Sequence, residues 1–271
     1  MSIQSFLKEY TRASLEALTS DQQIAAQKKH LSPKEASELR YYWYEFWARD
    51  KQKPPTGKWR VWMLMAGRGF GKSRTGSEWV RSVVETGKVK QIALVGATAR
   101  DVRSVMVDGP SGILSVFPLA KRPSFEPTNQ RIIFHNGVVA QTFSAEEPDR
   151  LRGFEFGAAW GDELASWQRD EDTWDQLNFT MREPRVDPQI VVTTTPKPTA
   201  LVRKLAEARD TVLVSGSTYE NAENLSADFL AKLAEKYEGT RLGDQEIHAR
   251  ILDALQGALF SRGMFRYGTP P

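Results

Sequence analysis

The chain has 271 residues, of which 40% are hydrophobic and 26% charged, which is the composition of an ordinary soluble globular protein. It contains no cysteine, and this excludes disulfides, a thiol nucleophile and cysteine-ligated zinc. The formal net charge of only +3 is low for a protein that coats nucleic acid, although it permits a local DNA-contacting patch.

The composition of the first fifty residues predicts helices. Residues 1–50 are polar and rich in Ala, Leu, Glu and Lys, and they end in an aromatic cluster at 41–47 that is typical of a packing face. Pro54 and Pro55 cannot continue a helix, so a break is expected there.

Alternating strands and helices are predicted next. The apolar runs 59–65 and 91–95 have the length of buried strands. Residues 72–86 place apolar side chains at helical spacing, and a further helix is expected after residue 98. Residues 131–144 predict a hairpin around Asn136-Gly137, a strong turn dipeptide.

The second half continues the same pattern. Further short strands are predicted at 156–160, 189–194 and 212–215, and residues 225–255 are expected to be helical. Residues 257–271 resemble a linker without a fold of its own. Strands separated by helices indicate an α/β fold with a mostly parallel central sheet flanked by helices.

Several function classes have little support. The three histidines lie far apart, without the spacing of metal ligands; they are His30, His135 and His248. No apolar run has the length of a membrane span, and the first residues lack the apolar core of a signal peptide. A soluble cytoplasmic protein without a membrane partner is therefore expected.

The segment between the first strand and the following helix matches a phosphate-binding loop. The P-loop pattern is Gly, four residues, then Gly-Lys-Ser/Thr, and here Gly71-Lys72-Ser73 fits while Ala66 replaces the first glycine. Glycines let backbone N–H groups turn toward phosphate oxygens, and the next helix points its N-terminus at them. The positions expected to bind the nucleotide are Gly67, Arg68, Gly69, Phe70, Gly71, Lys72, Ser73 and Arg74.

Lys72 and Ser73 have distinct expected roles within this loop. The Lys72 ammonium would neutralise the β- and γ-phosphates of ATP, and the Ser73 hydroxyl would ligate Mg²⁺. The alternative is a glycine-rich turn with a chance lysine, which the strand before it and the helix after it disfavour.

Two adjacent carboxylates follow the apolar strand 156–160. A P-loop ATPase needs an acidic residue at a strand end to hold Mg²⁺, often through water, and Asp162 suits that role. Glu163 would then be the base that orients the attacking water. An Asp-Glu pair alone is common on surfaces, so the interpretation depends on the strand and the upstream loop.

Hydroxyl side chains follow the strand that starts at residue 189. Thr193, Thr194 and Thr195 could lie beside the γ-phosphate, sense hydrolysis and couple it to motion. Threonine runs are also ordinary strand residues, and spacing alone favours neither interpretation.

Arginines could complete the site. Phosphoryl transfer gains from a cation on the transferred group, and the candidates are Arg68 in the loop and the pair Arg150 and Arg152 before the acidic strand. The pair could act on a neighbouring subunit or be solvated. Gln52, upstream of the first strand, could hydrogen-bond adenine, although a lone glutamine is weak evidence.

Taken in chain order, these motifs and their flanks resemble the ATPase domain of the large terminase subunit of tailed bacteriophages, a DNA-packaging motor. The resemblance runs from Ala48 to Phe260. The segments that carry it are 48–52, 59–62, the phosphate loop, 75–80, 96–102, 144–153, 160–165, 193–196 and 237–246.

The resemblance implies an ASCE-type P-loop NTPase with a small C-terminal helical lid. It implies that Lys72 and Ser73 bind phosphate and Mg²⁺, that Asp162 supports the metal, and that Glu163 is catalytic. It favours Arg68 as a functional residue and Arg152 over Arg150 as an arginine acting in trans. The expected division is 1–55 as a helical region with an adenine-binding segment, 56–215 as the ATPase core, 216–256 as the lid, and 257–271 as a linker.

The resemblance also implies partners. These are double-stranded DNA, a portal protein, a small terminase subunit and further copies of this chain in a ring on a procapsid, in the host cytoplasm. Large terminases pair this motor with a nuclease domain, and no acidic cluster of such a site is identified here, so no DNA cleavage is expected.

Two other functions remain open at this stage. One is a helicase-like ATPase, which would share the loop, the acidic strand and the threonines. The other is a nucleotide-gated DNA-binding module with incidental hydrolysis, against which Glu163 argues. Basic residues near plausible loops are candidate DNA contacts or simply a solvated face; they are Arg100, Arg103, Lys121 and Arg122.

Overall fold

The computed structural model describes residues 3–16 and 18–252, and the predicted linker 257–271 lies outside the described residues. Its centre is an eight-stranded sheet of order β3-β4-β5-β2-β6-β7-β1-β8. The strands are β1 (Val61–Ala66), β2 (Gln91–Gly96), β3 (Ser124–Glu126), β4 (Arg131–Ile133), β5 (Val139–Ser144), β6 (Ala158–Asp162), β7 (Gln189–Thr194) and β8 (Thr211–Gly216).

From β5 to β8 the neighbouring strands run parallel, while β3 and β4 extend the sheet antiparallel. The predicted hairpin is present: β4 and β5 pair around the Asn136-Gly137 turn, where Gly137 has a φ of 84°. The predicted mostly parallel α/β fold is thereby confirmed.

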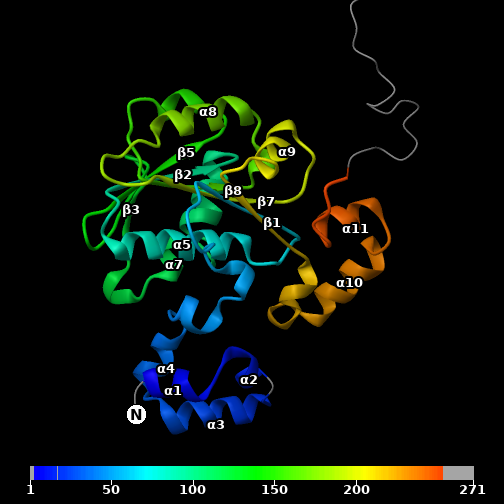
Figure 1. The fold of residues 1–271 in the computed structure, drawn as a ribbon. Helices are drawn as coiled ribbons and strands as arrows, with labels where there is room; N and C mark the ends of the chain where they lie inside the picture. The colour runs from blue at the N-terminus through cyan, green and yellow to red at the C-terminus, as the bar shows by residue number, and fades with distance from the viewer. Residues whose placement is uncertain (1–2, 17, 253–271) are drawn as a thin grey trace, which may run out of the picture.

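Helices cover both faces of the sheet (Figure 1). α5 (Lys72–Thr86) and α7 (Ile113–Val116) lie on one face, and α8 (Asp170–Thr180) and α9 (Ala200–Ala206) lie on the other. All six residues of β1 are buried, because its side chains alternate between a core on one face of the sheet and, on the other face, a second core and the small cluster around Phe70. Burial on both faces explains why the parallel strands are continuous apolar runs in the sequence.

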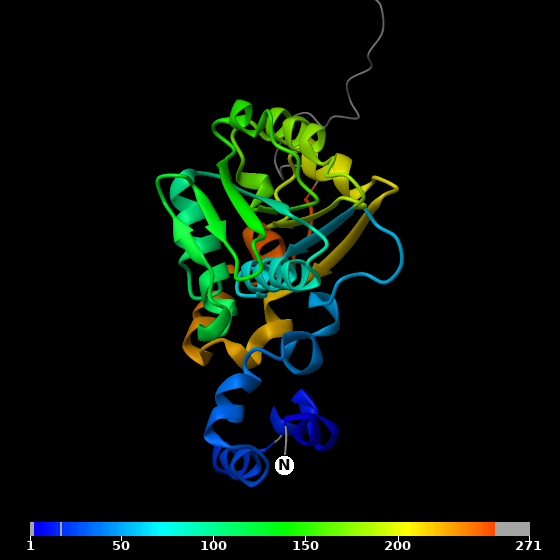
Figure 2. The same cartoon turned by 90° about the vertical axis from the view of Figure 1, so that its left-hand side faces the viewer.

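The N-terminal residues form a helical layer of their own. α1 (Ile3–Glu9), α2 (Arg12–Glu16), α3 (Ser20–His30) and α4 (Pro33–Leu39) pack around a small core that includes Phe6 and Phe46. Figures 1 and 2 both place these helices at the end of the molecule away from the sheet. The chain then reaches β1 through a π-helical turn at Trp43–Trp47 and a 3-10 turn, η2 (Asp50–Gln52).

The region expected to be helical after residue 225 consists of two short helices. α10 (Ala227–Tyr237) and α11 (Arg241–Glu246) are separated by a turn in which Gly239 has a φ of 71°. Residues 247–252 are not helical, so the prediction of helix through 255 was too long. None of the described helices combines the length and apolarity needed to cross a membrane.

Candidate functional site

The predicted phosphate loop connects β1 to α5. Gly69 and Gly71 have φ angles of 74° and 98°, which side-chain-bearing residues rarely adopt, so the glycines permit the turn. The Lys72 side chain is only 8% exposed, and its Nζ lies 3.0 Å from the Ala66 oxygen. Ala66 is itself the last residue of β1, so the replacement of glycine there does not interrupt the loop.

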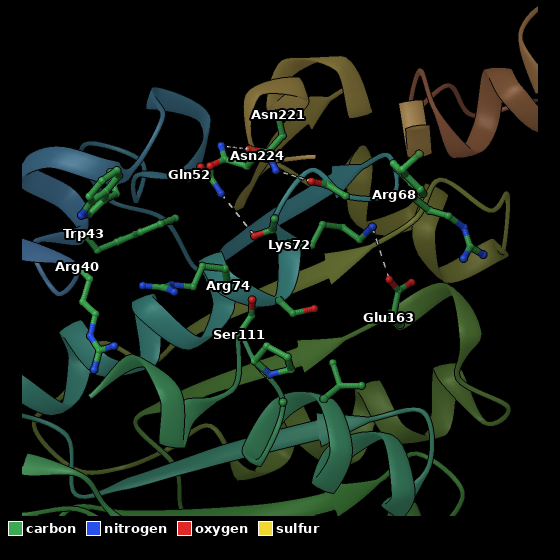
Figure 3. Close-up of a pocket in the computed structure, with 18 of the residues that line it drawn as sticks. Arg40, Trp43, Gln52, Arg68, Lys72, Arg74, Ser111, Glu163, Asn221 and Asn224 are labelled. Carbon is green, nitrogen blue, oxygen red and sulfur yellow. Dashed lines mark hydrogen bonds and ion pairs between the residues drawn. The ribbon is translucent and has the colours of Figure 1, made fainter. Parts of the chain in front are cut away.

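The acidic pair lies opposite this lysine. β6 and β1 both flank β7, so the carboxyl end of β6 and the phosphate loop meet at one edge of the sheet. Lys72 Nζ lies 3.6 Å from Glu163 Oε1, and Figure 3 shows the two side chains pointing toward each other. The geometry brings together the three predicted residues Lys72, Asp162 and Glu163.

The two carboxylates have different environments. Asp162 is 6% exposed, and burial raises its pKa to about 7, with a further rise from the Glu163 charge. A hydrogen bond from Thr193 and the charge of Lys72 oppose that rise in pKa. Glu163 is 37% exposed at its side chain and opens into the cavity described below. Its backbone adopts the left-handed conformation, with φ 50° and ψ 48°, which is uncommon for a residue with a long side chain.

Each of the three predicted threonines makes a hydrogen bond at the end of β6. Thr193 Oγ1 donates to Asp162 and accepts from Trp160 Nε1 at 2.9 Å. Thr194 Oγ1 accepts from the Ala165 N–H at 3.0 Å. Thr195 Oγ1 donates to Glu163 Oε2 at 3.3 Å. The threonine segment is therefore joined by side chains to the acidic pair.

A cavity of about 870 Å³ extends from these residues toward the N-terminal region. Several predicted binding residues line it: Gln52, Arg68, Gly69, Gly71, Lys72, Ser73, Arg74 and Glu163. Figure 3 shows Gln52 and Trp43 on the opposite side of the loop from Glu163. The cavity therefore has a charged end at Lys72 and Glu163 and an aromatic end at Trp43, over whose ring Arg74 Cζ lies at 4.9 Å.

Gln52 and Arg68 contact protein groups in this structure. Gln52 is 3% exposed; its Nε2 donates to Thr75 Oγ1 at 3.1 Å and its Oε1 accepts from the Arg49 N–H at 3.4 Å. Arg68 Nε is paired with Glu246 Oε2 of α11 at 2.8 Å. Figure 3 shows the Arg68 side chain directed away from Lys72.

The arginine pair before β6 does not line this cavity. Arg152 pairs with Asp149 at 3.1 Å and Arg150 with Glu147 at 3.4 Å, and both arginine side chains are about half or more exposed. Neither arginine lies at the phosphate loop of its own chain.

Two of the basic candidates for DNA contact form ion pairs within the chain: Arg103 pairs with Asp108, and Lys121 pairs with Glu85.

The residues present fit a magnesium-bound nucleotide. Within the described part of the chain, no group of three or more His, Cys, Asp or Glu side chains is arranged to hold a metal alone. Mg²⁺ in nucleotide sites commonly needs just one or two protein ligands besides phosphate oxygens and water. Asp162 at the β6 end and the cavity-lining Ser73 match that donor set.

Two functional candidates were not identified from the sequence. Arg49 donates to the Phe70 carbonyl, and Asn221 Nδ2 donates to the Gly69 carbonyl at 2.6 Å. Asn221 lies in η7 (Thr218–Asn224), directly after β8. Asn221 lies five residues beyond the end of β8, and both residues bond to backbone carbonyls, so no strand-end pattern in the sequence identifies them.

A phosphate loop after β1, with an acidic pair on a parallel strand separated from it by one strand, defines a P-loop NTPase. Residues 63–266 match the family model described as terminase large subunit, T4-like virus type, N-terminal. The chain belongs to this family, as its resemblance to the large terminase subunit predicted. No curated protein matches the chain significantly by sequence.

Solved structures share the fold at low sequence identity. The large terminase of a thermophilic bacteriophage, in complex with ADP, matches with a TM-score of 0.60 and 14% identity, over 80% of this chain and 53% of that one. The ATPase domain of the Thermus phage P74-26 large terminase matches with a TM-score of 0.58 and 16% identity, over 82% and 98%. The HK97 bacteriophage large terminase matches with a TM-score of 0.52 and 16% identity, over 81% and 50%. This chain thus spans about half the length of the first and the third of these proteins.

Proposed function

We propose that this chain is an ATP-hydrolysing motor domain that drives double-stranded DNA into a procapsid. The observation that carries the proposal is the approach of Lys72 Nζ to Glu163 Oε1, 3.6 Å apart at the mouth of a large cavity. Family membership supports the packaging role. The large terminase of the thermophilic bacteriophage, which shares the fold, has been solved with ADP and with ATP-gamma-S, which supports nucleotide binding.

The phosphate loop would bind the substrate. The N–H groups of residues 67–74 and the Lys72 ammonium would hold the β- and γ-phosphates, and Gln52 would lie at the base end. Ser73 and Asp162 would hold Mg²⁺, which when bound neutralises charge that develops on the phosphates. Glu163 would accept a proton from the attacking water and orient it in line with the γ-phosphate.

The threonines and arginines would act in later steps of the proposed ATP hydrolysis cycle. Thr193, Thr194 and Thr195 would report the state of the acidic pair. Thr193 and Thr195 donate hydrogen bonds to Asp162 and Glu163, and Thr194 accepts from the Ala165 N–H shortly after that pair. Arg68 would reach the phosphates once its ion pair with Glu246 breaks. Arg152 would act on the site of a neighbouring copy in a ring, because it lies outside the cavity of its own chain.

The proposed partners follow from the packaging role. They are double-stranded DNA, a portal protein, a small terminase subunit and further copies of this chain, assembled in the host cytoplasm. We also propose that this chain does not cleave DNA. Metal-dependent nicking of plasmid by the pure protein would contradict that part of the proposal.

ATP hydrolysis by two variants tests the chemical roles. Lys72→Ala should abolish binding of ATP, and Glu163→Gln should bind ATP but release phosphate at least about 100-fold more slowly, since general base catalysis contributes about 10²–10⁴-fold. Lys58→Ala is the matched control, because Lys58 is 89% exposed and pairs only at the surface with Asp187. Undiminished turnover in Lys72→Ala or Glu163→Gln would refute the assigned roles. DNA strand separation without packaging would favour a helicase-like ATPase instead.

A further inference from the structure

Side chains from outside the phosphate loop donate to three of its consecutive carbonyl groups, the third of which, Gly71, also accepts from the Thr75 N–H and hydroxyl of α5, both at 3.0 Å. The bonds run from Asn221 Nδ2 to the Gly69 oxygen (2.6 Å), from Arg49 Nη2 to the Phe70 oxygen, and from Gln52 Nε2 to the Gly71 oxygen (3.5 Å). Figure 3 shows Gln52 and Asn221 together on the side of the loop away from Glu163.

Bonds to these carbonyls set the direction of the N–H groups that would meet phosphate. A trans peptide is planar, and its C=O and N–H point to opposite sides. The described peptides include no cis bond, so a carbonyl held on the outside of the loop turns the next residue's N–H inward. The Gly69 carbonyl thus sets the N–H of Phe70, which closes the loop by donating to the Gly67 oxygen at 3.3 Å, and the Phe70 carbonyl sets the N–H of Gly71. An array of inward N–H groups is what binds a phosphate in such a loop.

The Arg49 side chain donates hydrogen bonds both to the phosphate loop and to η7. Its Nη1 donates to the Glu220 carbonyl and to Asn221 Oδ1, both at 2.6 Å, while Nη2 donates to Phe70. Its Cζ lies 4.4 Å from the centre of the Phe70 ring. That ring is fully buried and packs so closely on β8 that a Cβ at Gly216 would lie 2.2 Å from it. The Phe70 ring is therefore held between Arg49 and β8.

Asn221 uses both ends of its amide. Oδ1 accepts from Arg49 and from Asn224 Nδ2 (2.9 Å), while Nδ2 reaches the Gly69 oxygen. Its φ of −118° and ψ of 18° interrupt the helical turn of η7. Arg49 and Asn221, 172 residues apart in the sequence, form one hydrogen-bonded unit behind the loop.

We propose that Arg49 and Asn221 are positioning residues that hold the phosphate loop in its nucleotide-binding conformation. They join the loop to η7, the segment from which the chain continues into the lid helices α10 and α11. Loop geometry and the lid are thereby coupled through two side chains. This inference rests on the proposed function, since it concerns the binding of that same substrate.

Conservative variants separate this role from simple packing. Arg49→Lys keeps the positive charge but lacks the planar fork that serves three acceptors at once. Asn221→Asp keeps an acceptor for Arg49 but has no donor for the Gly69 carbonyl. Lys51→Ala is the matched control, because Lys51 links the same two segments through Glu220 at 2.9 Å without a bond to the loop.

Binding of ADP and of AMP, with Mg²⁺ present, gives the decisive readout. The ratio of the AMP Kd to the ADP Kd measures recognition of the β-phosphate and is insensitive to damage at the base end. In Arg49→Lys and Asn221→Asp the ADP Kd should rise about tenfold, the loss expected for a hydrogen bond to a charged or dipolar partner, while the AMP Kd changes little. Lys51→Ala should retain the wild-type ratio, and the KM for ATP should rise more than kcat falls in the two positioning variants.

The outcomes are distinguishable. A wild-type chain that binds neither ADP nor ATP refutes the proposed function and this inference with it. A wild-type chain that binds ADP, with variants that keep its Kd ratio, refutes the inference alone. Equal losses of ADP and AMP binding, or a lower melting temperature with unchanged affinity, would show that the two residues only support the fold.

Discussion

The Thr195 hydroxyl donates a hydrogen bond to the Glu163 carboxylate at 3.3 Å, from the end of β7 to the end of β6. Glu163 is held on its other side by Lys72 at 3.6 Å. The carboxylate proposed as the general base is therefore positioned by one hydroxyl and one ammonium, and its left-handed backbone depends on its surroundings to persist. Movement of the segment after β7 would change the orientation of Glu163.

Thr195→Val should slow hydrolysis while leaving ATP binding intact. Valine has nearly the same shape but no donor, so the Glu163 carboxylate loses an orienting bond. We expect kcat to fall about tenfold, the equivalent of roughly 1.4 kcal/mol in the barrier. Thr195→Ser restores the hydroxyl and should recover most of the rate. A Val variant with wild-type kcat would show that Thr195 does not position Glu163.

The fold was predictable where side chains are buried on both faces. β1, β2 and β7 are continuous apolar runs because each lies inside the sheet between helical layers. β3 was not predicted, since it has only three residues at the sheet edge and none of them is fully buried. The strand order was not predictable either, because it depends on contacts between segments far apart in the sequence.

The positions of Lys72 and Glu163 were predictable from the sequence, and the residues that hold the phosphate loop from behind were not. Lys72 and Glu163 follow from loop and strand-end patterns, and both lie where those patterns imply. Arg49 and Asn221 reach the loop through bonds to its backbone carbonyls. Such bonds require no particular spacing in the sequence, so only the folded chain reveals them. The helix predicted through 255 is divided by the turn at Gly239 and ends at Glu246, and helical composition registers neither feature.

Gly76→Ala should destabilise the core and disturb the acidic strand. A Cβ at Gly76 of α5 would lie 2.2 Å from Trp160 Cε2, and Trp160 donates to the threonine that contacts Asp162. We expect the free energy of unfolding to fall by about 1–3 kcal/mol, as for other overpacked cores. Urea unfolding measures it. Thr86→Ala, at an exposed position of the same helix, is the control and should change stability far less.

Glu238→Gln should loosen the C-terminal helical segment, residues 227–252, near neutral pH but not in acid. Hydrogen bonds from Tyr219 (2.6 Å), the larger cause, and from His248 (2.7 Å) hold the pKa of Glu238 below its usual range. A carboxyl with a lowered folded pKa stabilises the fold above its unfolded pKa of 4.5, and this contribution is lost as pH falls through the folded pKa.

Amide hydrogen exchange across residues 227–252 checks this prediction. At pH 7 the Glu238→Gln variant should exchange faster than the wild type in this segment, and the difference should disappear below the lowered pKa, where both side chains are neutral. A difference that persists unchanged in acid would mean that the charge of Glu238 does not hold this segment.

Arg152→Ala should affect hydrolysis only when copies of the chain meet. Arg152 pairs with Asp149, is 67% exposed at its side chain and lies outside the cavity of its own chain. If it completes a neighbour's site, wild-type turnover per molecule should rise with protein concentration, since a cation on the transferred phosphoryl group accelerates its transfer. The Arg152→Ala variant should have the turnover of the wild type in dilute solution, and its turnover per molecule should not rise with protein concentration.

Arg150→Ala, which removes the adjacent exposed arginine paired with Glu147, is the matched control, and its turnover should still rise with protein concentration. Constant wild-type turnover across concentrations would refute a role for Arg152 in trans, and loss of the rise in Arg150→Ala alone would assign that role to Arg150.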